Sequence, residues 1–217
     1  MAWGVPSTGE SRWPPLLAVV VAIALQVVLP NTVIKGLGPR WLIPVLEVLL
    51  LVALVVTNPH RVDREESNLR LLSLAMIAVI TVVNMVALGE LIRALLGHSG
   101  AGGRPLVFAS VPIWITNVIA FGLWYWELDR GGVTARMLPS HRGPDFLFPQ
   151  MSTPGSAPGW APRFVDYLYT SFTNATAFSP TDTMPLTPSA KLLMMVQSLA
   201  SLLTVALVIA RAVNILK

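Results

Sequence analysis

Long apolar runs are the feature that most constrains this chain of 217 residues. A helix needs about 20 consecutive apolar residues to cross the roughly 30 Å hydrocarbon core of a bilayer. Backbone in that core must satisfy its own hydrogen bonds, which favours helices. The sequence therefore predicts an all-α, polytopic membrane bundle with about five transmembrane helices. We expect them at Pro14–Pro30, Trp41–Val56, Leu71–Leu96, Leu106–Tyr125 and Ser189–Leu216.

Composition excludes several other classes of protein. Hydrophobic residues make up 54% of the chain and charged residues 12%, unlike an ordinary soluble domain. The net charge of +4 is modest and is spread over many loops, so a nucleic-acid surface is not expected. The chain has no cysteine, which rules out disulfides, thiolate chemistry and cysteine-ligated metals.

The last quarter of the chain departs from a plain series of spans. Phe164–Thr176 is an aromatic segment too short to cross a bilayer as a helix, and the polar turn Ser179–Pro185 follows it. An apolar run of about 20 residues then begins at Leu192. A half-length helix, a polar return and a spanning helix predict a re-entrant loop. Such backbone is tolerated at membrane depth only where protein or a water-filled cavity satisfies its polar groups.

The order Ser171-Phe172, Thr176, Asp182, Pro185, Thr187 resembles the pore loop of the potassium-channel superfamily. The long helix that follows resembles the channel inner helix. The segments WELDRGG, DFLFPQ and SFTNATAFSPTDTMPL also resemble a bacterial membrane-protein family of unknown function. The channel resemblance covers about the last quarter of the chain. It implies a pore helix, a filter-like turn and subunits arranged around a shared axis.

The centre of the motif differs from the family. Where the family has Thr-Val-Gly-Tyr-Gly, this chain has Ala177-Phe178-Ser179-Pro180-Thr181. Glycine supplies the positive-φ positions that aim successive carbonyls at one axis, and a β-branched residue there is an outlier. Pro180 also fixes its own φ and lacks an N–H. A potassium filter is therefore not expected. The candidate site is the pore turn, comprising Thr176, Ala177, Phe178, Ser179, Pro180, Thr181 and Asp182.

The last helix carries a second candidate surface. Gln197, Ser201, Thr204 and Val208 recur on one helical face. This face lines the cavity below the turn if the chain forms a channel, or Ser201 and Thr204 are small residues that permit close helix packing. For Asp182, the resemblance implies a place at the outer mouth. The alternative is that it caps or braces the turn.

Polar residues inside the other spans are a further candidate. Glu47 sits near the middle of the second span, where an ionisable group is costly and is a functional candidate by default. The alternative is a neutral or hydrogen-bonded glutamic acid. Gln26 in the first span is interpreted as a helix–helix contact, and Asn84 lies in the middle of the third.

The domain organisation follows from these segments. Residues 1–127 form a four-helix transmembrane region, 128–162 a Pro/Gly-rich extramembrane cap, and 163–217 the re-entrant loop and inner helix. The cap's apolar residues, such as Phe146 and Trp160, predict an ordered structure over the turn. Within WELDRGG, Glu127, Asp129 and Arg130 are expected to form a local ion-pair cluster.

These features lead to one functional hypothesis and one alternative. The first is an ion-channel-like membrane protein with a divergent, non-potassium filter. The alternative is a non-conducting scaffold or subunit of a membrane complex that reuses the pore-loop frame. An enzyme is not expected, because the histidines are scattered and neither G-x-S-x-G nor H-E-x-x-H occurs. No cofactor or metal is expected.

Partners and location are expected accordingly. The partner is the lipid bilayer, with homo-oligomers, tetramers if the chain is a channel, and a monovalent cation as ligand. We expect a multi-pass protein of the bacterial plasma membrane. Loop charge favours a cytoplasmic cap, whereas the resemblance implies an external cap and a cytoplasmic C-terminus. We follow the resemblance, because long loops translocate largely regardless of charge.

Overall fold

The computed structural model describes residues 10–34, 38–57, 67–96, 103–137, 142–153, 160–176 and 182–215. Nearly all elements within these residues are helices, and the strands among them are only two residues long. The prediction of an all-α fold is confirmed. The longer helices are α1 (Trp13–Val28), α3 (Leu42–Thr57), α4 (Ser67–Leu96), α5 (Gly103–Leu128), α7 (Phe164–Thr176) and α8 (Pro188–Ile215).

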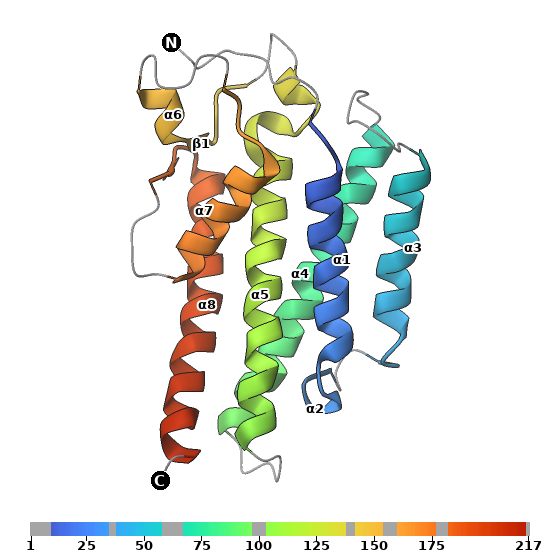
Figure 1. The fold of residues 1–217 in the computed structure, drawn as a ribbon, viewed down its shortest axis with the longest axis vertical. Helices are drawn as coiled ribbons and strands as arrows, with labels where there is room; N and C mark the ends of the chain where they lie inside the picture. Colours follow the sequence, from blue (N-terminus) through green and yellow to red (C-terminus); the bar gives the residue numbers. More distant parts are fainter. Residues whose placement is uncertain are drawn as a thin grey trace.

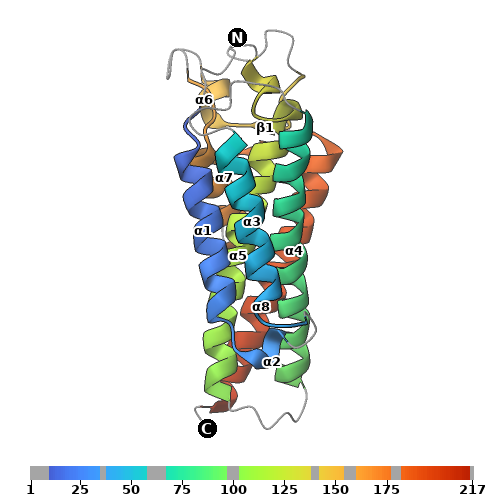
Figure 2. The same ribbon diagram turned by 90° about the vertical axis from the view of Figure 1, so that its right-hand side faces the viewer.

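The helices form an elongated bundle with the cap at one end (Figure 1). α1, α4, α7 and α8 begin at the cap end, whereas α3 and α5 end there (Figures 1 and 2). α5 lies in the centre, between α1 and α4 on one side and α7 and α8 on the other. The short helix α2 (Asn31–Ile34) packs against α4 at the opposite end.

Three of the described helices are long and apolar enough to cross a membrane, judged by length and composition. The candidate segments are Asn68–Leu96 in α4, Pro105–Gly131, which begins in α5 and extends three residues past its end, and Pro188–Arg211 in α8. α1 and α3 are apolar but shorter, with 16 residues each, or about 24 Å at a rise of 1.5 Å per residue. All five helices lie within a few residues of the ranges expected from the sequence.

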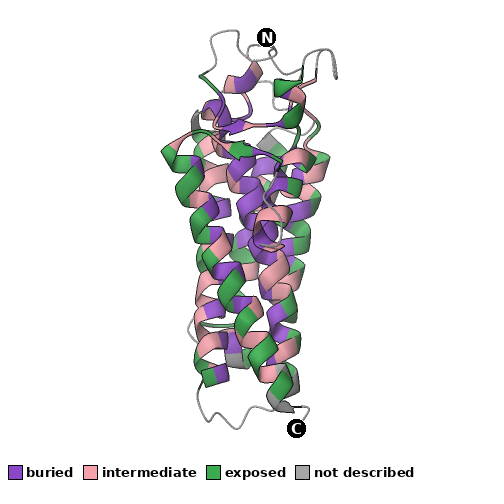
Figure 3. Ribbon diagram, turned by 90° about the vertical axis from the view of Figure 1, so that its left-hand side faces the viewer, coloured by how far each residue is buried: buried purple, intermediate pink, exposed green. Residues whose placement is uncertain are grey.

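The buried apolar residues form two clusters at different levels along the bundle. One apolar cluster joins α1, α4, α5 and α7 at the cap end, with Phe121, Tyr125 and Tyr167 among its largest members. A second cluster joins α2, α4 and α5 at the other end, around Leu91 and Leu106. Many outward-facing positions of α3 and α8 are exposed aliphatic residues, and Figure 3 shows the exposed positions on the side of α7 and α8.

The cap is held by short elements. These are the 3-10 turns η3 (Asp129–Gly131) and η4 (Ala135–Met137), the strand β1 (Phe146–Leu147), the helix α6 (Pro149–Ser152) and the strand β2 (Met184–Pro185). β1 pairs antiparallel with β2, which ties the cap to the segment before α8. The chain reverses at the end of α5 through three successive residues with positive φ, Arg130, Gly131 and Gly132. The two glycines of WELDRGG thus stand where a left-handed conformation is required.

Candidate functional site

The short helix α7 has the bounds expected from the sequence, Phe164–Thr176. At 13 residues it is about 20 Å long, which is less than a bilayer core. One face is buried and includes Tyr167, Ser171 and Ala175, and α7 packs against both α5 and α8. The opposite face exposes Tyr169 and Phe172. α7 is therefore an amphipathic half-length helix seated on its two neighbours.

α7 and α5 approach each other closely at Gly122. A Cβ atom at this position would lie 3.1 Å from the Cα of Leu168, so glycine is what permits the contact. At the same level of α7, the Ser171 hydroxyl donates to the carbonyl of Val118 on α5 at 2.6 Å. Backbone proximity and a side-chain hydrogen bond together hold the two helices in register.

Gln197 of α8 is the centre of a buried hydrogen-bond network. Its side-chain Nε2 donates to the Ser171 Oγ and carbonyl oxygens at 2.6 and 2.9 Å. Its Oε1 accepts from the Tyr125 hydroxyl at 2.5 Å and from Asn174 Nδ2 at 2.8 Å. A fully satisfied amide of this kind links three helices, because Tyr125 lies on α5, Ser171 and Asn174 on α7, and Gln197 on α8.

Further contacts continue this network along α8. Ser198 donates to Asn174 Oδ1 at 3.0 Å, and Ser201 donates to the carbonyl of Ala175. Trp114 of α5 donates its indole N–H to Ser201 Oγ at 2.7 Å. Carbonyls in the last turn of a helix have no partner within the helix, and here α8 supplies one. We call the set Tyr125, Ser171, Asn174, Gln197 and Ser201 the closed interface.

The candidate inner-helix face therefore lies inside the chain. Gln197, Ser201 and Thr204 are 0, 0 and 4% exposed, and Val208 is half-buried. Thr204 donates to the carbonyl of Ala200 in its own helix at 2.7 Å. In this conformation the side chains of Gln197, Ser201 and Thr204 contact other parts of the same chain.

Most of the pore turn lies outside the described residues. Ala177, Phe178, Ser179, Pro180 and Thr181 belong to that part of the chain. Thr176 ends α7 and donates to the carbonyl of Thr173 at 2.8 Å. Asp182 is exposed, and Thr183 beside it is buried. The flanks of the turn are thus placed at the C-terminal end of α7 and before β2.

The end of the loop is anchored to the cap by Asp145. Its Oδ1 accepts from the Thr187 hydroxyl at 2.6 Å, and its backbone carbonyl accepts from the N–H of Leu186 at 2.8 Å. The Thr187 oxygen also accepts from the N–H of Ala190, as an N-cap residue does. Pro188 then occupies the first helical position, where the missing N–H costs nothing.

A buried ionic cluster joins the cap to the top of α5 and α7. Asp129 is fully buried and accepts from the Tyr167 hydroxyl at 2.5 Å and from the N–H of Asp145 at 2.8 Å. It also lies 3.5 Å from the guanidinium of Arg130, and Glu127 lies 3.9 Å from that of Arg70. The expected local pair between Asp129 and Arg130 is therefore formed, whereas Glu127 pairs with Arg70 of α4, outside WELDRGG. Buried charges of this kind are stable only when paired and hydrogen-bonded.

Arg136 completes this cluster from η4. Its Nη1 donates to the carbonyls of Trp126 and Asp129 at 2.5 and 3.2 Å, and its guanidinium lies 5.3 Å from the ring centre of Tyr167. Burial raises the pKa of Tyr167 well above its ordinary value, and the adjoining Asp129 raises it further against the opposing effect of Arg136. The Tyr167 hydroxyl therefore stays protonated and donates to Asp129.

The sequence prediction missed several residues that carry these contacts. Tyr125, Asn174, Asp145 and Arg136 are isolated in sequence, and no spacing relates them to Gln197 or to Asp129. The sequence indicated only that buried polar groups would occur in these segments. Polar residues inside apolar spans and charged residues in an aromatic cap need partners, although the sequence does not show which ones.

Glu47 lies in the other part of the bundle. It is fully buried on α3, which packs against α1 and α4 and not against the closed interface. Among the described residues, no group of three or more His, Cys, Asp or Glu side chains could hold a metal ion. Comparison of the chain with protein-family models, with curated proteins and with solved structures finds no match.

Proposed function

We propose that this chain is a multi-pass integral membrane protein whose last helices form a sealed, non-conducting version of a pore-loop frame. It would act as a scaffold or subunit of a membrane complex. By the channel resemblance, α7 corresponds to the pore helix and α8 to the inner helix. The burial of the polar face of α8 against α5 and α7 carries the proposal.

The physical reason concerns what a pore must offer to an ion. A conducting path along a shared axis needs polar groups or carbonyls facing that axis. Here Gln197 and Ser201 hydrogen-bond to helices of the same chain. The outward face of α8 instead exposes aliphatic residues such as Leu199 and Leu202. That face suits lipid or another apolar helix better than water or an ion.

Location and orientation belong to the same proposal. The chain would reside in a bacterial plasma membrane, with the cap outside and the C-terminus in the cytoplasm. The support is the pore-loop resemblance, in which the turn faces outward. α1 and α3 would be the two short crossings of a five-helix protein.

A second candidate is conduction of a monovalent cation by a homo-oligomer, with four chains around one axis. The half-length helix α7 favours it, because a pore helix likewise ends at membrane depth and its chain turns back. The pore turns of the four chains would then line the path.

Reconstitution separates the two candidates. We expect vesicles that contain the purified protein to remain as tight to sodium and potassium as protein-free vesicles, with the fold checked by circular dichroism. A cation flux that Asp182→Asn or Thr181→Val abolishes would overturn the first proposal in favour of the second. A stable tetramer in detergent would point the same way.

Crosslinking tests the subunit role directly, because the chain has no native cysteine. Leu199→Cys places one thiol on the exposed face of α8, and Val52→Cys places one on the exposed face of α3 as a matched control. In native membranes we expect a discrete crosslinked adduct from Leu199→Cys and none from Val52→Cys. Equal labelling of both positions by lipid-phase reagents with no adduct would contradict a subunit surface on α8.

A further inference from the structure

Four buried polar side chains on four different helices have side-chain atoms that lack hydrogen-bond partners among the described residues. They are Gln26 on α1, Glu47 on α3, Asn84 on α4 and Asn117 on α5, with exposed fractions of 6, 0, 2 and 3%. Each has at least one side-chain nitrogen or oxygen without a hydrogen-bond partner among the described residues. For Gln26, Glu47 and Asn117 this holds for every polar side-chain atom. We call these residues the polar layer.

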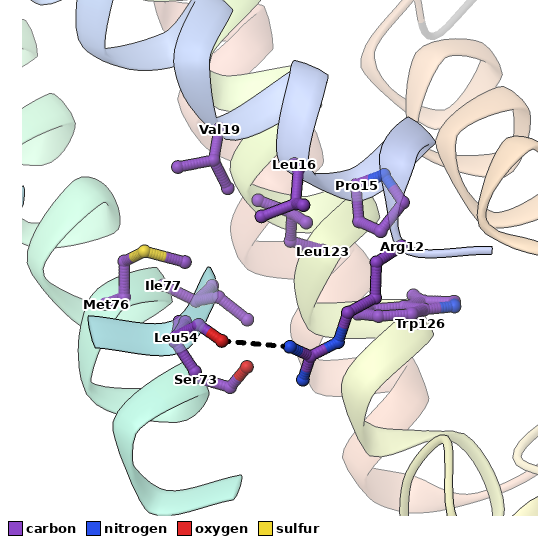
Figure 4. A pocket seen from close by; sticks show the side chains of 10 residues that line it. All are labelled: Arg12, Pro15, Leu16, Val19, Leu54, Ser73, Met76, Ile77, Leu123 and Trp126. Atoms are coloured by element: carbon purple, nitrogen blue, oxygen red, sulfur yellow. Dashed lines mark hydrogen bonds between the residues drawn. The ribbon is translucent and has the colours of Figure 1, made fainter. Parts of the chain in front are cut away.

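The register of the helices brings the polar layer to one depth. Val19, Leu54, Ile77 and Leu123 line a single pocket from four different helices (Figure 4). Seven residues are two helical turns, which cover about 10 Å and return to nearly the same face. Since α1 and α4 run away from the cap and α3 and α5 run towards it, counting seven residues away from the cap from these four positions gives Gln26, Glu47, Asn84 and Thr116. Asn117, the next residue along α5, is turned by about 100° from the face of Thr116.

Two further observations agree with this register. The Gln26 amide lies close enough to the Glu47 carboxyl to interact with it, although the two do not meet hydrogen-bond geometry. A second pocket is lined by Gln26, by Ile43 and Pro44 one turn before Glu47, and by Val83 next to Asn84. The first three members of the polar layer therefore share one neighbourhood.

Such a set of groups is costly unless something binds it. An unpaired buried amide costs about 1–3 kcal/mol, and an isolated carboxylate costs more. A proton on Glu47 would need one acceptor, which Gln26 alone supplies. It would leave Asn84 Nδ2 and both polar side-chain atoms of Asn117 without partners among the described residues. Oxygen atoms from amides and a carboxylate are instead the ligands that hard cations prefer.

The single negative charge of the site favours a monovalent over a divalent cation. Glu47 is the one ionisable group of the polar layer, and among the described charged residues Arg40 is the one that lines the adjoining pocket. Arg40 donates to Asn31 Oδ1 and to the carbonyl of Val27, which holds its guanidinium at the end of α1. A single carboxylate neutralises one positive charge. A divalent ion would leave a net charge in a medium of low dielectric constant.

We propose that the polar layer binds one small monovalent metal cation, of the class of sodium, inside each chain. Glu47 supplies the compensating charge, and the side-chain oxygens of Gln26 and Asn84 complete the protein part of the shell. The amides can turn either oxygen or nitrogen inwards, so no backbone movement is needed. The pocket between Gln26 and Arg40 is the access route from the end of the bundle opposite the cap.

The experiment measures sodium binding to the purified full-length protein in detergent. Binding of ²²Na⁺ is followed by equilibrium exchange, and the thermal midpoint is recorded in sodium chloride and in choline chloride at equal ionic strength. We expect one sodium per chain and a midpoint that rises with sodium and then saturates. Glu47→Gln and Gln26→Leu should weaken binding at least tenfold. Glu90→Gln, which removes a carboxylate from the surface of α4, should leave binding unchanged.

Several outcomes would overturn the proposal. One is a midpoint indifferent to sodium, lithium and potassium in a folded wild-type protein, and another is sodium binding that persists in both Glu47→Gln and Gln26→Leu. A midpoint that responds to pH alone would mean that Glu47 is simply protonated. If Glu47→Gln does not fold, Gln26→Leu and Asn84→Leu carry the test. Vesicle flux and sodium binding are separate measurements. A bound cation without flux is therefore compatible with the proposed non-conducting function.

Discussion

Buried polar side chains are hydrogen-bonded on one side of α5 and lack hydrogen-bond partners among the described residues on the other. Towards α7 and α8, the closed interface satisfies both side-chain atoms of Gln197 through contacts with two other helices. Towards α1, α3 and α4, Gln26 has no hydrogen-bond partner on either side-chain atom among the described residues. Both glutamines lie in apolar helices and are almost fully buried. Within the described part of the chain, the same residue type is therefore hydrogen-bonded on one side of α5 and unsatisfied on the other.

The contrast indicates which buried polar residues hold the fold and which are available for a ligand. An amide whose hydrogen bonds are all made in an apolar interior links the helices that it contacts. Removing it takes a hydrogen-bond partner from each of them and lowers the free energy of unfolding. An unsatisfied amide lowers stability in the absence of a ligand, and removing it relieves that cost. Stability measurements on matched substitutions can therefore distinguish the two sides.

The largest effect is expected for Gln197→Leu. The substitution keeps much of the side-chain volume but removes the hydrogen bonds of Gln197 to Tyr125, Ser171 and Asn174, of which Ser171 and Asn174 keep other partners. Since each lost hydrogen bond contributes about 0.5–1.5 kcal/mol and the Tyr125 hydroxyl loses its acceptor, we expect a loss of about 3 kcal/mol. Chemical denaturation in detergent micelles measures it. A loss below about 1 kcal/mol would mean that the network is not a main support of α7.

Gly122→Ala tests the backbone approach on the same side. The added Cβ would lie 3.1 Å from the Cα of Leu168 and 3.2 Å from its Cδ1, so α7 must shift or α5 must bend. Overpacking of this kind costs about 1–3 kcal/mol, and we expect a net loss of about 2 kcal/mol in the free energy of unfolding.

Gly89→Ala is the matched control, because a Cβ at Gly89 of α4 meets nothing within 4 Å. Alanine favours a helix interior over glycine by up to about 1 kcal/mol, so this variant should be slightly more stable than the wild type. Equal losses in both variants would show that the approach of α7 to α5 is not the cause.

Gln26→Leu is expected to act in the opposite direction to Gln197→Leu. Measured without sodium, it should raise the free energy of unfolding by about 1 kcal/mol, because an unpaired buried amide is replaced by an apolar side chain of similar size. In saturating sodium the advantage should vanish or reverse, since the variant lacks a ligand for the cation. Destabilisation in both media would place Gln26 in a satisfied network instead.

Much of the fold could be predicted from the sequence because it depends on local patterns. The apolar runs gave the five longer helices within a few residues, and the aromatic segment between Arg163 and the polar turn gave α7. The shared face of Gln197, Ser201 and Thr204 also followed from the helical period. What this face contacts did not follow, because the rotation of α8 is determined by packing against α5 and α7.

The polar layer also shows that contacts between helices could not be predicted from the sequence. Glu47 stood out because a charged group is rare at that depth, whereas Gln26 and Asn84 were isolated polar residues in separate spans. Their common level arises from antiparallel helices whose vertical offsets are determined by the connections and the packing. A sequence pattern records which face a residue is on, but not its depth relative to a neighbouring helix.

Tyr125→Phe should produce the smallest effect on the closed interface. The hydroxyl donates to Gln197 Oε1, but that oxygen also accepts from Asn174 at 2.8 Å and so keeps a partner. The expected loss is therefore about 0.5–1 kcal/mol, that of one hydrogen bond without a stranded acceptor. Tyr169→Phe, on the exposed face of α7, should change stability by less than about 0.5 kcal/mol. If Tyr125→Phe costs as much as Gln197→Leu, the hydroxyl and not the amide organises the interface, and the contrast between the two glutamines no longer explains the stability of this half of the bundle.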